Sequence, residues 1–181
     1  HVHLGNAPSK LDLLFQMVND HQVPIKSISP THVARTSDLF DSAIEFGKLG
    51  GRIDITTGAS KFTDPHKAVL MAIERKLPVD RITFSTDGNA GLDLKDKNNN
   101  VIGTKPASIR ANLEEFIKLV KTKNISIPDA LTLVTSNVAD NLGLNNKGRL
   151  QVGKDSDFCV FDNSWNLKTV ISKGKIHSIG S

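Results

Sequence analysis

The sequence has little cysteine and no long apolar run. Cys159 is the single cysteine among 181 residues, which excludes a disulfide framework within the chain and is typical of a reducing, cytoplasmic compartment. No apolar run approaches the roughly 18 residues of a membrane-spanning helix, so we expect no membrane partner. The segment 1–5 has neither the charged nor the apolar part of a secretory signal peptide, and we expect none there.

The excess of positive over negative charge is also small. The chain has 23 Lys and Arg residues against 19 Asp and Glu residues, a formal net charge of +4 at pH 7. The densest basic segment, residues 118–123, is interrupted by Leu119, Val120 and Thr122, so it does not form a dedicated nucleic-acid surface. We therefore expect no nucleic-acid partner. A hydrophobic share of 38% with 23% charged residues is typical of a globular domain and not of a disordered chain.

Strand-like and helix-like patterns alternate over residues 1–145. The predicted strands are a short one ending near residue 3, then 25–31, 52–57 and 81–86. The predicted helices are 9–20, 37–49, 64–76, 106–123 and 126–142. This alternation predicts four βα units and a parallel sheet.

The tail, residues 146–181, has a different pattern. Its short β-rich runs are 158–161, 167–171 and 175–179. Gly153, Asp162-Asn163 and Gly174 interrupt the β-rich pattern, which indicates a few antiparallel strands. We therefore place a boundary near Asn145, between a βα domain (1–145) and a C-terminal β segment (146–181). Cys159 lies in the first apolar run, and we expect it to be buried and inert.

Three polar residues fall at the ends of predicted strands: His3, His32 and Asp87. His3 and His32 are 29 residues apart, and His32 and Asp87 are 55 apart, which is about one and two βα units of roughly 30 residues. The three side chains are therefore expected on one rim of the sheet, where α/β proteins bind ligands. Two imidazoles and a carboxylate suit zinc or a similar divalent ion.

A purely structural role is open for each of these residues taken alone. A strand-end histidine commonly makes a structural hydrogen bond, and Asp87-Gly88-Asn89 has good turn chemistry. Arg35, three residues after His32, has a planar fork that suits a carboxylate, but by residue type it is equally a surface arginine. His1 shares the strand face of His3 and either binds a metal with it or faces inward without a ligand.

Other polar residues are expected to lie outside any site. We expect His21, His66 and His177 to be solvated, and Asp54 to be a charge on a strand face. Residues 88–105 are expected to form an 18-residue loop on the rim, and loops of this length are typical of a lid or a substrate wall.

Four segments together resemble a known family. They are Val2-His3-Leu4-Gly5, Pro30-Thr31-His32-Val33-Ala34-Arg35, Gly50-Gly51-Arg52-Ile53-Asp54-Ile55-Thr56 and Ser85-Thr86-Asp87-Gly88-Asn89. In this order they resemble the second half of the isoaspartyl (β-aspartyl) dipeptidases, which belong to the amidohydrolase superfamily of metal-dependent TIM barrels. Residues 147–157 resemble that superfamily's return from the barrel into a small β-sandwich. The resemblance covers essentially the whole chain. It implies an α/β fold, namely the C-terminal half of a (β/α)8 barrel followed by part of the sandwich.

The resemblance also implies roles for four residues. His3 and His32 would bind the more exposed zinc of a binuclear pair. Asp87 would bind the more buried zinc and act as general base for the bridging hydroxide. Arg35 would hold a carboxylate of the β-aspartyl substrate. The implied enzyme is a zinc metallo-dipeptidase that hydrolyses the isopeptide bond of β-aspartyl dipeptides and forms a homo-oligomer when full length.

This sequence departs from the family in two ways. The family's His-x-His pair and the carbamylated lysine that bridges its two metals lie upstream of residue 1, so we expect these 181 residues alone to be inactive. A serine that follows Asp-Gly-Asn in the family is replaced by Ala90-Gly91, which leaves the strictness of β-aspartyl specificity open. Two alternatives remain. One is an amidohydrolase acting on cyclic amides, such as a dihydroorotase or hydantoinase, and the other is a non-catalytic α/β fragment with structural histidines.

Overall fold

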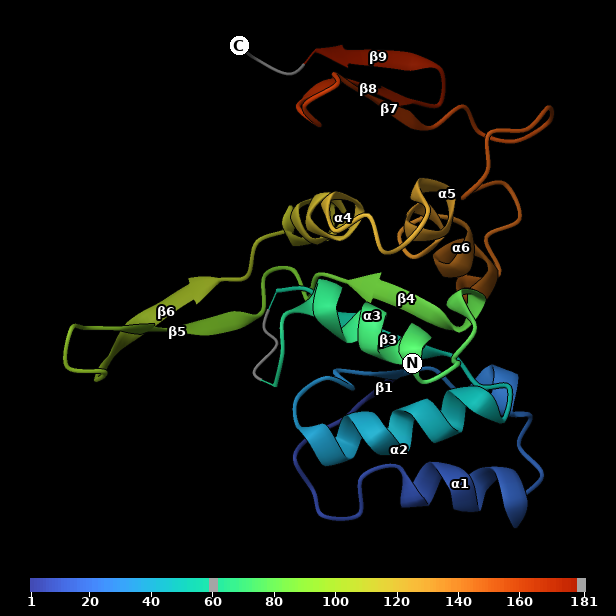
Figure 1. Cartoon of the computed structure of the whole chain (residues 1–181), viewed down its shortest axis with the longest axis vertical. Helices are drawn as coiled ribbons and strands as arrows, with labels where there is room; N and C mark the ends of the chain where they lie inside the picture. The colour runs from blue at the N-terminus through green and yellow to red at the C-terminus, as the bar shows by residue number, and fades with distance from the viewer. Residues whose placement is uncertain (59–61, 179–181) are drawn as a thin grey trace.

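The first part of the chain pairs four short strands in parallel, two by two (Figure 1). The structure is a computed structural model, and it describes residues 1–58 and 62–178. The strands are β1 (Val2–His3), β2 (Pro30–Thr31), β3 (Ile53–Thr56) and β4 (Ile82–Ser85). β1 pairs with β2, β3 pairs with β4, and the N–H of Val33 donates to the carbonyl of Asp54 between the two pairs. The parallel pairing that the alternation predicted is confirmed.

The helices between these strands bury their apolar faces in a common core. They are α1 (Asp12–Asn19), α2 (Ser37–Lys48) and α3 (Pro65–Glu74). Phe40 and Phe46 of α2 are fully buried in one cluster with Ile53 and Ile55 of β3. Each such side chain stabilises the fold by about 1.5–3 kcal/mol relative to exposure, so the core holds β3 firmly beneath the rim.

The prediction of a strand over residues 25–31 is wrong in its first half. Ile25–Ser27 form a 3-10 helix, and only Pro30–Thr31 pair with β1. Pro24 and Pro30 have no N–H to donate to a ladder, which limits strand pairing along this segment.

Three more helices follow β4, and they are shorter than the pattern predicted. They are α4 (Ala111–Lys121), α5 (Ile127–Thr132) and α6 (Ser136–Leu142). The Ser126 side chain accepts the N–H of Asp129, which confirms that start signal. The single helix predicted over 126–142 is wrong, because Thr135, with φ −131° and ψ −93°, leaves the helical region and separates α5 from α6. None of the helices in the described residues has the length and apolar character to cross a membrane.

A β-hairpin occupies the segment predicted as an irregular loop. β5 (Gly91–Lys95) and β6 (Val101–Pro106) pair antiparallel and extend away from the helices (Figure 1). The Asp96 carboxylate closes the turn by accepting the N–H groups of Asn98 and Asn100. The loop prediction is therefore wrong, and the helix predicted from residue 106 begins at Ala111 because β6 continues to Pro106.

The tail forms a separate three-stranded antiparallel sheet, as its pattern predicted. Its strands are β7 (Phe158–Phe161), β8 (Leu167–Ser172) and β9 (Lys175–Ser178), and the predicted end at Ile179 lies outside the described residues. Trp165 joins this sheet to the first part through an edge-to-face contact with Phe116 of α4, with ring centroids 5.7 Å apart. The prediction of a buried Cys159 is wrong, because the residue is exposed, as are its neighbours Phe158 and Val160 on β7.

Candidate metal centre

The three strand-end residues lie together at one rim. One ligand atom each from His3, His32 and Asp87 falls within 4.8 Å of the others. Nδ1 of His3 lies 2.9 Å from Nε2 of His32. His3 ends β1, His32 directly follows β2, and Asp87 follows β4 by two residues. The geometry therefore brings together all three predicted metal ligands, while their metal-binding and catalytic roles stay predictions.

Two of the three leave their strands in a left-handed backbone conformation. The φ angles are 64° at His32 and 50° at Asp87. A non-glycine residue in this region is uncommon and costs on the order of 1–3 kcal/mol, a cost that persists only where the surroundings hold it. The N–H of Arg35 donates to the carbonyl of His32 and contributes to that support.

The imidazole of His32 is buried and in the form that ligates metals. Its Nδ1 lies 2.7 Å from Oγ1 of Thr56. Burial lowers the pKa of His32 below its ordinary value, and the positive charge of Arg35 lowers it further. These effects favour the neutral ring, which has one nitrogen lone pair available. His3, by contrast, is exposed, so the cluster opens to solvent on that side.

Asp54 lies beneath the rim, and we did not anticipate its place there. We expected a charge on a strand face, and the residue is 2% exposed. Its carboxylate accepts hydroxyl hydrogen bonds from Thr31 of β2 at 2.6 Å, from Thr83 of β4 at 2.7 Å and from Ser85. Burial raises the pKa of Asp54, and the three hydroxyl groups oppose this rise. The hydroxyl residues on both neighbouring strands were the signal for a buried carboxylate between them.

Arg35 has an unsatisfied group that suits a ligand. Its Nε is buried and has no hydrogen-bond acceptor among residues 1–58 and 62–178. A buried N–H without a partner costs about 1–3 kcal/mol, and a ligand oxygen would remove this cost. Arg35 follows His32 by three residues, and its positive charge is among the causes that lower the pKa of His32.

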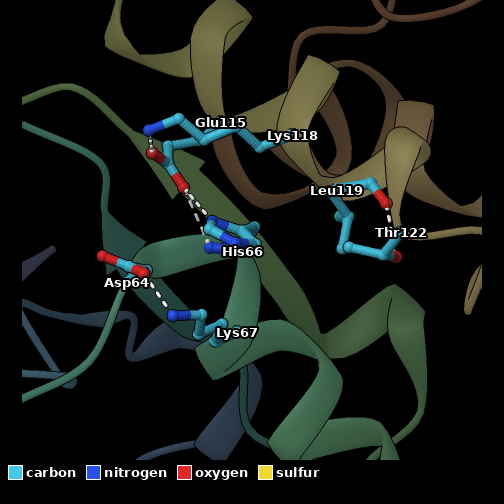
Figure 2. Close-up of polar contacts among 7 residues, drawn as sticks. All are labelled: Asp64, His66, Lys67, Glu115, Lys118, Leu119 and Thr122. Carbon is cyan, nitrogen blue, oxygen red and sulfur yellow. Dashed lines mark hydrogen bonds and ion pairs between the residues drawn. The ribbon is translucent and has the colours of Figure 1, made fainter.

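A second polar cluster joins α3 to α4 (Figure 2). The N–H and Nδ1 of His66 lie 3.0 and 2.8 Å from Oε2 of Glu115, and Nζ of Lys118 lies 2.6 Å from Oε1. Asp64, at the start of α3, makes no capping bond and pairs instead with Lys67, so Glu115 satisfies the helix end from α4. The prediction of a solvated His66 is wrong, because its partner comes from a helix 49 residues further along the chain.

The comparison with protein families decides which family the chain represents. The model described as "Amidohydrolase family" matches residues 2–177. The chain belongs to the amidohydrolase family. This confirms the resemblance that the four sequence segments predicted.

Solved structures add detail to this assignment. A β-aspartyl dipeptidase from the thermophilic keratin-degrading Fervidobacterium islandicum AW-1, solved with a β-Asp-Leu dipeptide, has a TM-score of 0.83 and 32% identity, covering 96% of this chain and 46% of that chain. A second dipeptidase structure from this organism has a TM-score of 0.81 and 29% identity, and the match covers 96% of this chain and 44% of that chain. An adenine deaminase, at 19% identity and a TM-score of 0.59, covers 98% and 50% and shows similarity of fold alone. The chain thus spans less than half the length of the two dipeptidases.

Proposed function

We propose that this chain is part of a zinc-dependent β-aspartyl dipeptidase that hydrolyses the isopeptide bond of β-aspartyl dipeptides. The observation that carries the proposal is the convergence of His3, His32 and Asp87 in an amidohydrolase chain that is 32% identical to such a dipeptidase. The finer fold belongs to the same proposal: four βα units forming the C-terminal half of a (β/α)8 barrel, followed after residue 145 by part of a β-sandwich. The two parallel strand pairs and the separate tail sheet support it.

The donor set fits zinc. Two imidazole nitrogens and a carboxylate are ligands that zinc accepts, and burial favours the neutral form of His32. In a binuclear centre His3 and His32 would hold one ion and Asp87 the other, with the further ligands, including a carbamylated lysine, outside these 181 residues. Bound zinc supplies a lowered pKa for a bound water and polarisation of the scissile carbonyl.

Asp87 is the residue we propose as general base. It is half-buried, at the rim and within 4.8 Å of the histidine nitrogens. In this position its carboxylate can accept a proton from the attacking water and pass it to the nitrogen of the leaving amine. The left-handed backbone at Asp87 turns the chain at the end of β4, and Gly88 and Asn89 continue this turn.

Arg35 is the residue we propose to bind a substrate carboxylate. A β-aspartyl dipeptide carries carboxylates that a guanidinium can hold through two parallel hydrogen bonds. The unsatisfied Nε of Arg35 supports this role. Ala90 and Gly91 offer no hydroxyl for a second contact, and this favours keeping cyclic-amide hydrolysis as the second candidate. We also propose that the full-length enzyme forms a homo-oligomer.

The proposal is tested by a substrate panel on the full-length polypeptide that contains these residues. β-Asp-Leu, α-Asp-Leu, dihydroorotate and hydantoin are each supplied, and product release is followed by chromatography. We expect hydrolysis of β-Asp-Leu above the other three, and a loss of about 10²–10⁴-fold in Asp87→Asn, which removes the base. Asp12→Asn, at an exposed position of α1, is the matched control and should retain full activity. Hydrolysis of a cyclic amide in preference to β-Asp-Leu would support the second candidate, and no hydrolysis of any substrate would contradict both.

A further inference from the structure

β3 contributes no ligand atom to the described cluster, yet it contacts the strands on both sides that do. It pairs along its length with β4, and its Asp54 carbonyl accepts the N–H of Val33 at the end of β2. Asp54 and Thr56 are two residues apart on this strand and therefore face the same side. Asp54 bonds hydroxyl groups of the neighbouring strands, and Thr56 contacts the His32 ring directly.

The two nitrogens of His32 have different surroundings. Nε2 faces Nδ1 of His3 at 2.9 Å, and Nδ1 faces the Thr56 hydroxyl at 2.7 Å. A neutral histidine that ligates through Nε2 must carry its proton on Nδ1. The Thr56 hydroxyl oxygen is in position to accept that proton's hydrogen bond. His32 is 7% exposed and Thr56 is 4% exposed, so bulk water does not replace this acceptor.

We propose that Thr56 is a positioning residue for His32. Its hydroxyl accepts the Nδ1–H of the imidazole, selects this tautomer, and holds Nε2 toward the centre formed with His3 and Asp87. The inference rests on the proposed metal site and adds to it a residue that contacts neither the metal nor the substrate. Loss of a hydrogen-bond partner that orients a ligating histidine in this way typically weakens metal binding by about 10–100-fold.

Substitution at this position separates positioning from packing. Thr56→Val keeps the shape of the side chain and removes the hydroxyl, while Thr56→Ser keeps the hydroxyl. Thr57→Val is the matched control, because the hydrogen bonds of the Thr57 hydroxyl within the described residues go to the Ser85 carbonyl and to Asn112, not to any of the three ligands. Zinc affinity is measured on the full-length polypeptide by competition with a chromophoric chelator, together with the visible spectrum of the cobalt(II) form.

We expect the zinc dissociation constant to rise about 10–100-fold in Thr56→Val and the cobalt spectrum to change. Thr56→Ser and Thr57→Val should keep the wild-type affinity and spectrum. Wild-type affinity in Thr56→Val, or an equal loss in Thr57→Val, would overturn the positioning role and leave the proposed metal site intact. A wild-type protein that binds no zinc or cobalt at this cluster would overturn the proposed site itself.

A second measurement needs no variant and covers the case in which Thr56→Val does not fold. Long-range ¹H–¹⁵N NMR correlations of the metal-free wild-type protein report which imidazole nitrogen of His32 is protonated. The inference predicts the proton on Nδ1. A proton on Nε2 in the neutral ring would overturn it.

Discussion

Glu115→Gln is expected to lower the free energy of unfolding by about 2 kcal/mol. The buried carboxylate of Glu115 accepts two hydrogen bonds from His66 and one from Lys118 (Figure 2). Glutamine can keep the two bonds from His66 through its amide oxygen. This acceptor is uncharged, so each bond contributes roughly 1 kcal/mol less to the free energy of unfolding than a bond to the carboxylate. The Lys118 side chain is 57% exposed, so losing its pair costs only about 0.2–1 kcal/mol. Release of a buried charge offsets part of the total.

Thermal and urea denaturation measure this effect. For a chain of this size about 2 kcal/mol corresponds to a fall in Tm of roughly 4–8 °C. Glu114→Gln, on the exposed neighbour of Glu115 in α4, is the control and should stay within about 0.5 kcal/mol of wild type. An equal loss of stability in both variants would refute the account. It would mean that the negative charge on α4, and not the hydrogen bonds from Glu115 to α3, stabilises the fold.

The pH dependence gives an independent check on the same carboxylate. Burial alone raises the pKa of Glu115, but the hydrogen bonds from Lys118 and His66 outweigh it and lower the pKa. A carboxyl group whose pKa is lowered on folding stabilises the protein above its ordinary pKa, and this stabilisation is lost as pH falls through the folded value. The difference in the free energy of unfolding between wild type and Glu115→Gln should therefore have its full size near pH 7 and shrink below about pH 4. A difference that stays constant to pH 3 would contradict the assignment.

Three further predictions concern the rim. Asp54→Asn should lower the free energy of unfolding by about 2 kcal/mol, because an amide NH₂ takes the place of one carboxylate oxygen and cannot accept the hydroxyl hydrogen bonds which that oxygen accepts from Thr31, Thr83 or Ser85, and unchanged urea denaturation would refute this. Arg35→Lys should raise KM for β-Asp-Leu at least about tenfold with little change in kcat, because a lysine cannot form the two-pronged contact. An unchanged KM would show that Arg35 does not hold the substrate. Dialysis of the full-length polypeptide against dipicolinate should abolish hydrolysis, and added zinc should restore it; activity in the metal-free protein would contradict a metal-dependent reaction.

Spacing along the sequence predicted the rim because strand ends repeat with the βα unit. His3, His32 and Asp87 could be placed together without coordinates, since parallel strands bring their carboxyl ends to one edge. The helix start at Ser126 was also predictable, because the N–H group that its hydroxyl accepts belongs to Asp129, three residues further on.

Features that depend on distant partners were not predictable. Asp54 is an acceptor for hydroxyl groups 23, 29 and 31 residues away, and His66 meets Glu115 from 49 residues away. Without these contacts, both residue types are typical of the surface. The hairpin was missed because Asn98, Asn99 and Asn100 favour a turn, and the flanking β5 and β6 are exposed along most of their length.

Zinc content tests the central claim most directly. The full-length polypeptide is expressed with zinc, freed of loosely bound metal, and measured by inductively coupled plasma mass spectrometry beside His3→Ala, His32→Ala and the control His21→Ala, whose side chain is exposed after α1. The account predicts bound zinc in wild type and His21→Ala, with reduced stoichiometry in His3→Ala and His32→Ala. The same zinc stoichiometry in all four proteins would contradict a metal centre at this rim.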